Sequence, residues 1–182
     1  MEERKISNAE FQAADIFNLP YKNDTFDVAF TNAVLWTLEK PLQALEELKH
    51  VVRPGGMIAC REPSSEGVLY YFESKIFEKT LTLQFRSQDA LGCDRNIGKK
   101  LFFYFSEVKL YNIQLSVSSD VYSSPEKRSL LGQYSISAWN EAPWAKHVRE
   151  ELWATEEEIK GFQEELLRWE KYYWSLCFCK VV

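Results

Sequence analysis

The 182-residue sequence contains no run of about 18 apolar residues, so it predicts no helix that spans a membrane. Its 22 lysines and arginines are scattered among 27 aspartates and glutamates and form no basic stripe. Because nucleic-acid binding depends on cations clustered against phosphates, DNA and RNA are not expected partners. The first ten residues, MEERKISNAE, are polar and charged, unlike a signal peptide. We therefore expect a cytoplasmic protein.

Cysteine and histidine are scarce, with four and two residues. No two cysteines form a CxxC pair and no histidine stands at metal-ligand spacing from one, so the sequence predicts no metal site. Cys177 and Cys179 lie two residues apart in an apolar run, which places both on one face of a strand. A redox pair is conceivable, but buried strand thiols are the commoner case. Without a secretion signal, all four are expected to be reduced.

Motifs of covalent and metal-dependent catalysis are absent: there is no G-x-S-x-G, no H-E-x-x-H and no P-loop. His50 is predicted at the end of a helix, where a cation interacts favourably with the helix dipole. His147 lies in the polar stretch AKHVREE, where a general-base role is conceivable because histidine most often fills it. Catalytic residues are left unassigned.

Glycine is also sparse, and its positions exclude one type of cofactor loop. Such a loop places glycines between a strand and the following helix, where they let the backbone approach the ligand. The seven glycines are Gly55, Gly56, Gly67, Gly92, Gly98, Gly132 and Gly161. The doublet Gly55-Gly56 follows a predicted helix and precedes a predicted strand, which is the reverse order. No glycine precedes Asp15.

What is present is a strand–helix–strand unit. Residues 26–32, FDVAFTN, are nearly continuously apolar and predict a strand buried on both faces. Residues 41–52 carry leucines at three- and four-residue steps, which predicts an amphipathic helix, and residues 57–62 predict the next strand. Two strands joined by a crossover helix lie parallel, and ligands bind outside their carboxyl ends, here Asn32 and Glu62.

Local patterns predict the other elements. Thr155 and Glu158 form a capping box before an amphipathic helix, whose apolar face is Ile159, Phe162, Leu166, Trp169 and Tyr173. The rest of the chain is assigned as follows: a short strand over residues 9–15, helices over 66–86 and 99–110, a strand over 112–122, an ambiguous stretch over 124–144 and an apolar strand over 172–181.

The stretch AADIFNLPYKNDTFDVAFTNAVLW, followed by PLQALEELKHVVRPGGMIACREP, resembles the class I S-adenosylmethionine-dependent methyltransferases, and most closely the methyltransferase domain 11 group. The resemblance covers residues 11–63. It implies an α/β, Rossmann-like sheet that is mostly parallel and has an antiparallel C-terminal strand. Residues 1–182 would form one partial domain, with residues 64–105 as a helical cap over the substrate.

The same resemblance implies methyl transfer from S-adenosylmethionine to a small-molecule acceptor. Asp15 would accept a hydrogen bond from the adenine amino group, and the backbone of Ile16 would meet the ring. Asn32 and Ala33 would border the methionine part of the cofactor. The acceptor, its reacting atom and the oligomeric state are not specified.

Candidate substrate residues follow the predicted strand ends. Glu62 would either orient a substrate hydroxyl or amine, or cap a loop, and the second role is the commoner one. Aromatic residues are expected either to line an apolar pocket or to pack in the core, again the commoner case. They are Trp36, Tyr70 and Tyr71, with Phe72, Phe102, Phe103 and Tyr104 as further members.

In the family, an earlier strand and a Gly-rich loop hold the cofactor's carboxylate and ribose. The resemblance therefore implies that this sequence begins inside the fold and lacks about 60–70 residues, judged from usual element lengths. The strand of residues 9–15 would then detach, pair with residues 26–32, or pair with another chain. An exposed apolar edge strand would favour a homodimer. The alternative to an enzyme is a non-catalytic methyltransferase-like fragment that acts as a protein-interaction module.

Overall fold

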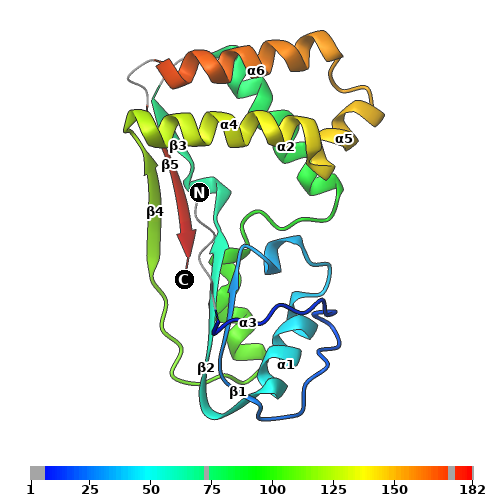
Figure 1. The fold of residues 1–182 in the computed structure, drawn as a ribbon, viewed down its shortest axis with the longest axis vertical. Coiled ribbons are helices and arrows are strands. Elements are labelled where there is room, and N and C mark those ends of the chain that lie inside the picture. The colour runs from blue at the N-terminus through cyan, green and yellow to red at the C-terminus, as the bar shows by residue number, and fades with distance from the viewer. Residues whose placement is uncertain (1–6, 72–73, 172–174, 182) are drawn as a thin grey trace.

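The computed structural model describes residues 7–71, 74–171 and 175–181 (Figure 1). One end of the molecule holds a small α/β unit and the other a layer of helices, and strands connect the two (Figure 1). The longer elements are β1 (Phe26–Asn32), α1 (Pro41–Val51), β2 (Val52–Pro63), β3 (Leu69–Tyr71), α2 (Lys75–Ala90), α3 (Leu101–Glu107), β4 (Val117–Tyr122), α4 (Pro125–Glu141), α5 (Pro143–Glu150), α6 (Glu156–Lys171) and β5 (Ser175–Val181). The short 3-10 helices are η1 (Leu35–Thr37), η2 (Ser65–Gly67) and η3 (Ile97–Lys100).

The predicted strand–helix–strand unit is confirmed. β1 and β2 pair in parallel, with Ala29 opposite Ile58 and Asn32 opposite Arg61. α1 begins at Pro41, whose fixed φ suits the first turn of a helix, and buries its leucine face against the sheet. The carboxyl ends of β1 and β2 consequently lie side by side.

β1 is an edge strand, and the prediction that both of its faces are buried is wrong, because alternate residues on one face are exposed. Among the described strands it pairs only with β2. Val28 is 53% exposed, Phe30 is 62% exposed, and Met57 on β2 beside them is 60% exposed. The expected exposed apolar edge is therefore present.

The sheet is not mostly parallel, which corrects the expected topology. β1–β2 is the parallel pair, whereas β5 runs antiparallel to each of β2, β3 and β4. The antiparallel C-terminal strand is confirmed. On one side, β5 pairs with β4 from Leu176 to Val181. On its other side, β5 pairs with β3 near its start and with β2 near its end, so most strand pairs in the sheet are antiparallel.

Several predicted elements differ in the structure; the strand predicted over 112–122, for example, begins only at Val117. Residues 9–15 form no strand, because they have no strand partner; Phe11 is 94% exposed, and the bridge in this region joins Asp15 to Asn18 locally. The helix predicted over 66–86 begins only at α2, since Ser74 caps that helix by accepting a hydrogen bond from the backbone N–H of Phe77 (3.2 Å).

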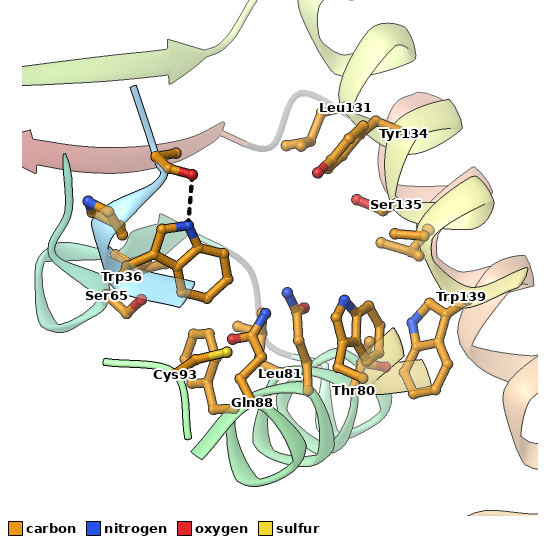
Figure 2. A pocket seen from close by; sticks show the side chains of 18 of the residues that line it. Trp36, Ser65, Thr80, Leu81, Gln88, Cys93, Leu131, Tyr134, Ser135 and Trp139 are labelled. Carbon is orange, nitrogen blue, oxygen red and sulfur yellow. Dashed lines mark hydrogen bonds between the residues drawn. The ribbon is translucent and has the colours of Figure 1, made fainter. Parts of the chain in front are cut away.

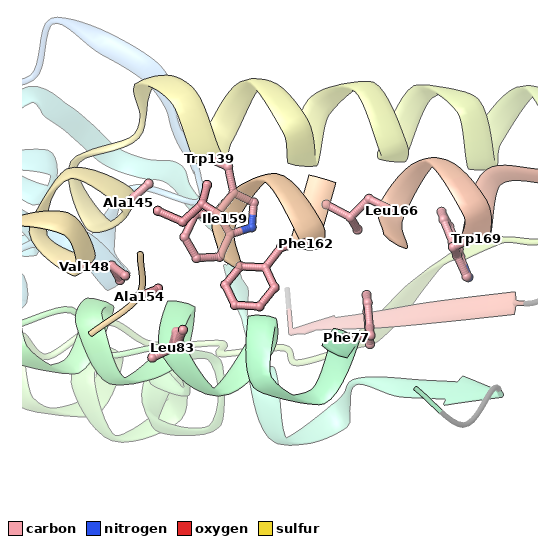
Figure 3. Close-up of a cluster of buried hydrophobic side chains, with 10 residues drawn as sticks. All are labelled: Phe77, Leu83, Trp139, Ala145, Val148, Ala154, Ile159, Phe162, Leu166 and Trp169. Atoms are coloured by element: carbon pink, nitrogen blue, oxygen red, sulfur yellow. The ribbon is translucent and has the colours of Figure 1, made fainter. Parts of the chain in front are cut away.

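The helical layer combines α2 with helices from later in the chain, and the cap expected from residues 64–105 stays a prediction. α2 packs with α4, α5 and α6 around a core that includes Trp139, Phe162 and Trp169 (Figure 3). η3 and α3 instead pack with α1 in a second core. An amphipathic helix must bury its apolar face, and α2 finds the matching faces on α5 and α6. No helix in the described ranges is long and apolar enough to cross a membrane.

Candidate functional site

Glu62, the penultimate residue of β2, fixes the turn that follows β1. Its side chain is fully buried, and its two carboxylate oxygens accept backbone N–H hydrogen bonds from Val34 (3.2 Å), Leu35 (3.1 Å) and Trp36 (3.3 Å). Burial raises the pKa of Glu62, and these hydrogen bonds oppose that rise. These contacts correspond to the loop-capping role, because three N–H groups at the start of η1 donate hydrogen bonds to one carboxylate.

The turn itself has a strained residue. Ala33 has a φ of 54°, a left-handed conformation that is uncommon for a residue with a Cβ, and its N–H donates to the carbonyl oxygen of Arg61 (2.8 Å). Asn32, immediately before it, is exposed. The chain thus turns sharply at the carboxyl end of β1, and such backbone strain often accompanies a functional site.

Asp15 and Ile16 lie in an irregular segment. Asp15 is exposed, and its Oδ1 accepts a hydrogen bond from the N–H of Phe17 (2.9 Å). Ile16 is half-buried and packs against the core of the α/β unit. The hydrogen bonds of Asp15 are local, so the placement of Asp15 beside Asn32 stays a prediction.

A large cavity separates this turn from the helical layer. Its volume is about 880 Å³, within the range of small-molecule sites. Ala33 and Trp36 line one wall, and α2 and α4 form the others (Figure 2). Trp36 is held in place because its indole N–H donates to the carbonyl oxygen of Ala33 (3.1 Å), the dashed line in Figure 2. The side chains of Tyr70 and Tyr71 lie outside the described part.

Most of the aromatic lining was not predicted as a pocket. Phe102 and Phe103 are more than half exposed on α3, away from the lining residues, whereas Trp36 does line the cavity. Phe72 lies outside the described residues. The aromatic walls come instead from Phe77, Phe85, Tyr134, Trp139, Trp144 and Trp169. The sequence signal for Trp139 and Trp169 is helical spacing, which equally describes a core.

The titratable side chains of the described lining are few. Burial raises the pKa of Cys93, and the nearby Asp89 carboxylate adds to the rise; burial also raises the pKa of Tyr122. Asp120 forms an ion pair with Arg61 (3.4 Å). Cys93 and Tyr122 therefore stay protonated near neutral pH.

Both histidines lie elsewhere. His147 packs edge-on against Trp153, with ring centroids 5.3 Å apart, and is not a lining residue. His50, in the last turn of α1, contacts the carbonyl oxygens of Glu47 (2.9 Å) and Tyr21 (3.3 Å), in keeping with its predicted place at a helix end. No cluster of three His, Cys, Asp or Glu side chains suited to a metal occurs within the described ranges.

The residues present fit part of an adenosyl cofactor. The local turn uses Oδ1 of Asp15 as its hydrogen-bond acceptor. Oδ2 can therefore accept a hydrogen bond from an amine. Asn32 offers an exposed side chain at a strand end. The described residues contain no Gly-rich turn between a strand and a helix. The doublet that begins at Gly55 (φ 79°) lies in the irregular start of β2.

The chain is similar in sequence to known methyltransferases. Residues 1–60 match the sequence model of the methyltransferase domain family. An uncharacterised methyltransferase of Schizosaccharomyces pombe is 32% identical over 139 residues, which cover 75% of this chain and 49% of the relative. A demethylmenaquinone methyltransferase of Bacillus mycoides is 27% identical over 128 residues, which cover 63% of this chain and 54% of the relative. The chain thus spans about half the length of these two relatives.

The fold has a solved counterpart. The crystal structure of a proposed methyltransferase from Bacillus halodurans superposes with a TM-score of 0.53 at 12% identity, and covers 94% of this chain and 74% of that one. At this identity the likeness concerns the fold, and the sequence matches supply the family. The chain belongs to the class I S-adenosylmethionine-dependent methyltransferase family.

Proposed function

We propose that this chain takes part in methyl transfer from S-adenosylmethionine to a small molecule held in the cavity beside Trp36. The observation that carries the proposal is the position of the cavity, which is lined by Ala33 and Trp36, directly beyond the carboxyl end of β1. In open α/β sheets this is where ligands bind. Asn32 and Ala33 would border the methionine part of the cofactor, and Asp15 and Ile16 its adenine.

The bound cofactor supplies an electrophilic methyl group on a sulfonium. The cavity walls hold the acceptor in line with that group and exclude water, and orientation alone can contribute about 7–11 kcal/mol. Held by Asn32 and Ala33, the cofactor would supply the methyl group, and its sulfur would leave with the electron pair of the carbon–sulfur bond. An acceptor with an O–H or N–H group also releases a proton.

The lining favours an acceptor that needs little help from a base. Cys93 and Tyr122 stay protonated, Asp120 is paired with Arg61, and neither histidine lines the cavity. The acceptor atom is therefore one that carries a free lone pair in a neutral molecule, such as the nitrogen of an aromatic amine.

The described residues lack the Gly-rich loop whose hydrogen-bond donors would hold the cofactor's carboxylate and ribose. We infer that a Gly-rich segment outside residues 7–181 supplies them, so the chain alone binds weakly. For the 182-residue chain we expect a dissociation constant for S-adenosylhomocysteine on the order of 1 mM, about −4 kcal/mol. The same chain joined to a Gly-rich strand–loop–helix segment is expected to bind in the micromolar range.

Calorimetry with S-adenosylhomocysteine on the extended polypeptide tests the assignment of Asp15. Asp15→Ala is expected to weaken binding by about 1–3 kcal/mol, as for the loss of a hydrogen bond to a charged group. Glu10→Ala is the matched control, because Glu10 is also an exposed carboxylate in the same irregular segment. Equal affinities of the Asp15→Ala and Glu10→Ala variants would contradict the adenine assignment. If neither the 182-residue chain nor its extended form bound S-adenosylhomocysteine, the proposed function would be wrong.

A second candidate is a non-catalytic interaction module that binds a second copy of this chain through β1. The observation that favours it is the exposed apolar edge formed by Val28, Phe30 and Met57, since a bare edge strand is a template for pairing. The two candidates separate by cofactor binding. A module would form a stable dimer and show no affinity for S-adenosylhomocysteine, even when extended.

A further inference from the structure

The cavity between the β1 turn and the helical layer has a mainly apolar lining. Aromatic and aliphatic side chains together supply most of its lining, and the aliphatic ones include Leu81, Leu131 and Leu166. Figure 2 shows Trp36 on one side and Trp139 on the other, with Leu81 and Leu131 between them on opposite walls. We propose that the cavity binds a neutral, ring-bearing apolar molecule, and, resting on the proposed function, that this molecule is the methyl acceptor.

The charges of the described lining exclude an anionic ligand. Asp120 is its one charged residue, and no lysine, arginine or histidine of the described chain lines it. A carboxylate or phosphate on the ligand would enter an apolar cavity whose described lining offers no cation to pair with it.

A cationic ligand is also disfavoured, although aromatic walls can bind cations. The guanidinium of Arg61 already neutralises Asp120, with 3.4 Å between the nearest nitrogen and oxygen. A second cation beside Asp120 would meet the positive charge of Arg61. A neutral ligand avoids both conflicts.

Several polar groups of the walls are engaged within the fold. The Trp36 indole N–H donates to Ala33, as described above, and the hydroxyl of Thr80 donates to the carbonyl oxygen of Ile76 (2.8 Å). The hydroxyl of Thr37 donates to the carbonyl oxygen of Val34 (2.8 Å). These donors are not arranged to recognise a polyhydroxylated ligand such as a sugar.

The other polar side chains are spread over two walls. Gln88 and Cys93 lie on the side of α2 near Trp36, whereas Tyr134 and Ser135 lie on α4 (Figure 2). This spacing suits one or two polar substituents on a ring. The lining on α4 also includes an exposed aliphatic residue, Leu130, which is 66% exposed. An apolar extension of the ring can therefore pass over α4.

Three probes with one ring system separate the possibilities by charge. At pH 7, 1-naphthol is neutral, 1-naphthoate is an anion and 1-naphthylmethylammonium is a cation. Calorimetry on the 182-residue chain without cofactor is expected to show that 1-naphthol binds about tenfold or more tightly than either ion. Equal binding of the three probes, preference for either ion, or no binding of 1-naphthol would overturn the proposal.

A pair of variants on α4 locates the binding. Ser135 lines the cavity, whereas Ser137, two residues later on the same helix, is exposed and is not a lining residue. Ser135→Phe is expected to fill space and weaken 1-naphthol binding about tenfold or more, and Ser137→Phe to leave it unchanged. Equal effects of the two variants, with both folded by circular dichroism, would overturn the location.

The outcome is independent of the cofactor assignment. Binding of 1-naphthol in the absence of cofactor concerns the cavity alone. If 1-naphthol binds and S-adenosylhomocysteine does not, the proposed function fails and the cavity assignment holds as a binding site. If S-adenosylhomocysteine binds and 1-naphthol does not, the present inference alone fails.

Discussion

Glu62 Oε1 lies 3.1 Å from the backbone nitrogen of Leu35, and this contact links the end of β2 to the turn that carries Trp36 into the cavity. Two neighbouring N–H groups, of Val34 and Trp36, bind the same carboxylate. The position of the cavity wall therefore depends on one buried acidic side chain.

Glu62→Ala should destabilise the fold. Three N–H groups at the start of η1 would lose their acceptor, and we expect a loss of about 2–4 kcal/mol in the free energy of unfolding. Glu62→Gln keeps one acceptor oxygen and should lose less. Urea unfolding measures both, with Glu46→Ala on the surface of α1 as the control. An unchanged stability of Glu62→Ala would show that the turn does not depend on this carboxylate.

Gly56 and Gly161 should respond in opposite directions to the same change. A Cβ on Gly56 would stand 2.6 Å from the carbonyl oxygen of Asp27, whereas a Cβ on Gly161 in α6 would meet no atom within 4 Å. Gly56→Ala is expected to destabilise by about 2 kcal/mol or more. Gly161→Ala is expected to stabilise by about 0.5–1 kcal/mol, because alanine loses less backbone entropy in a helix. Thermal unfolding checks both, and a neutral Gly56→Ala would contradict the close approach of β1 and β2.

The capping box of α6 predicts a pH dependence. The ammonium of Lys79 lies 2.5 Å from Glu158, and together with the N–H of Thr155 it lowers the pKa of Glu158 to about 2. An acid whose pKa is lowered by folding stabilises the fold above its unfolded pKa, here 4.5, and loses that contribution as the pH falls toward 2. Glu158→Gln should therefore show a smaller fall in stability between pH 5 and pH 2. The same fall in both proteins would contradict the lowered pKa of Glu158.

The exposed edge predicts self-association through β1. If two copies pair there, Phe30→Lys should give a monomer in light scattering while its stability changes by no more than about 0.5 kcal/mol, since Phe30 is already 62% exposed. Val117→Lys is the matched control on the opposite edge strand, where Val117 is 70% exposed. A monomeric unmodified chain, or dissociation by Val117→Lys instead, would contradict this interface.

The strand–helix–strand unit could be predicted because its signals are local. Pro41 marks the start of α1, the leucine spacing marks its buried face, and Thr155 with Glu158 marks the start of α6. Each signal depends on neighbours within about one helical turn. The structure confirms α1 and α6 at the predicted places.

The cavity and the sheet pairing could not be predicted in the same way, because they depend on contacts between distant segments. Apolar residues at helical spacing on α4 describe a core wall and a cavity wall equally well, and only the position of α2 opposite Trp139 makes the difference. Likewise, the apolar run of β1 predicts a buried strand, and the exposure of Phe30 follows from which strands pair with it.

The central claim is that the carboxyl end of β1 borders an adenosyl cofactor beside the cavity. Backbone amide NMR of the isotope-labelled chain, titrated with millimolar S-adenosylhomocysteine, tests it directly because weak binding is still detected by shift changes. The account predicts that the amides of Asn32 and Ala33 and the indole of Trp36 shift, while those of Lys160 and Gly161 in α6, which are not lining residues, change little. Shifts confined to other parts of the chain, or no shifts at all, would contradict it.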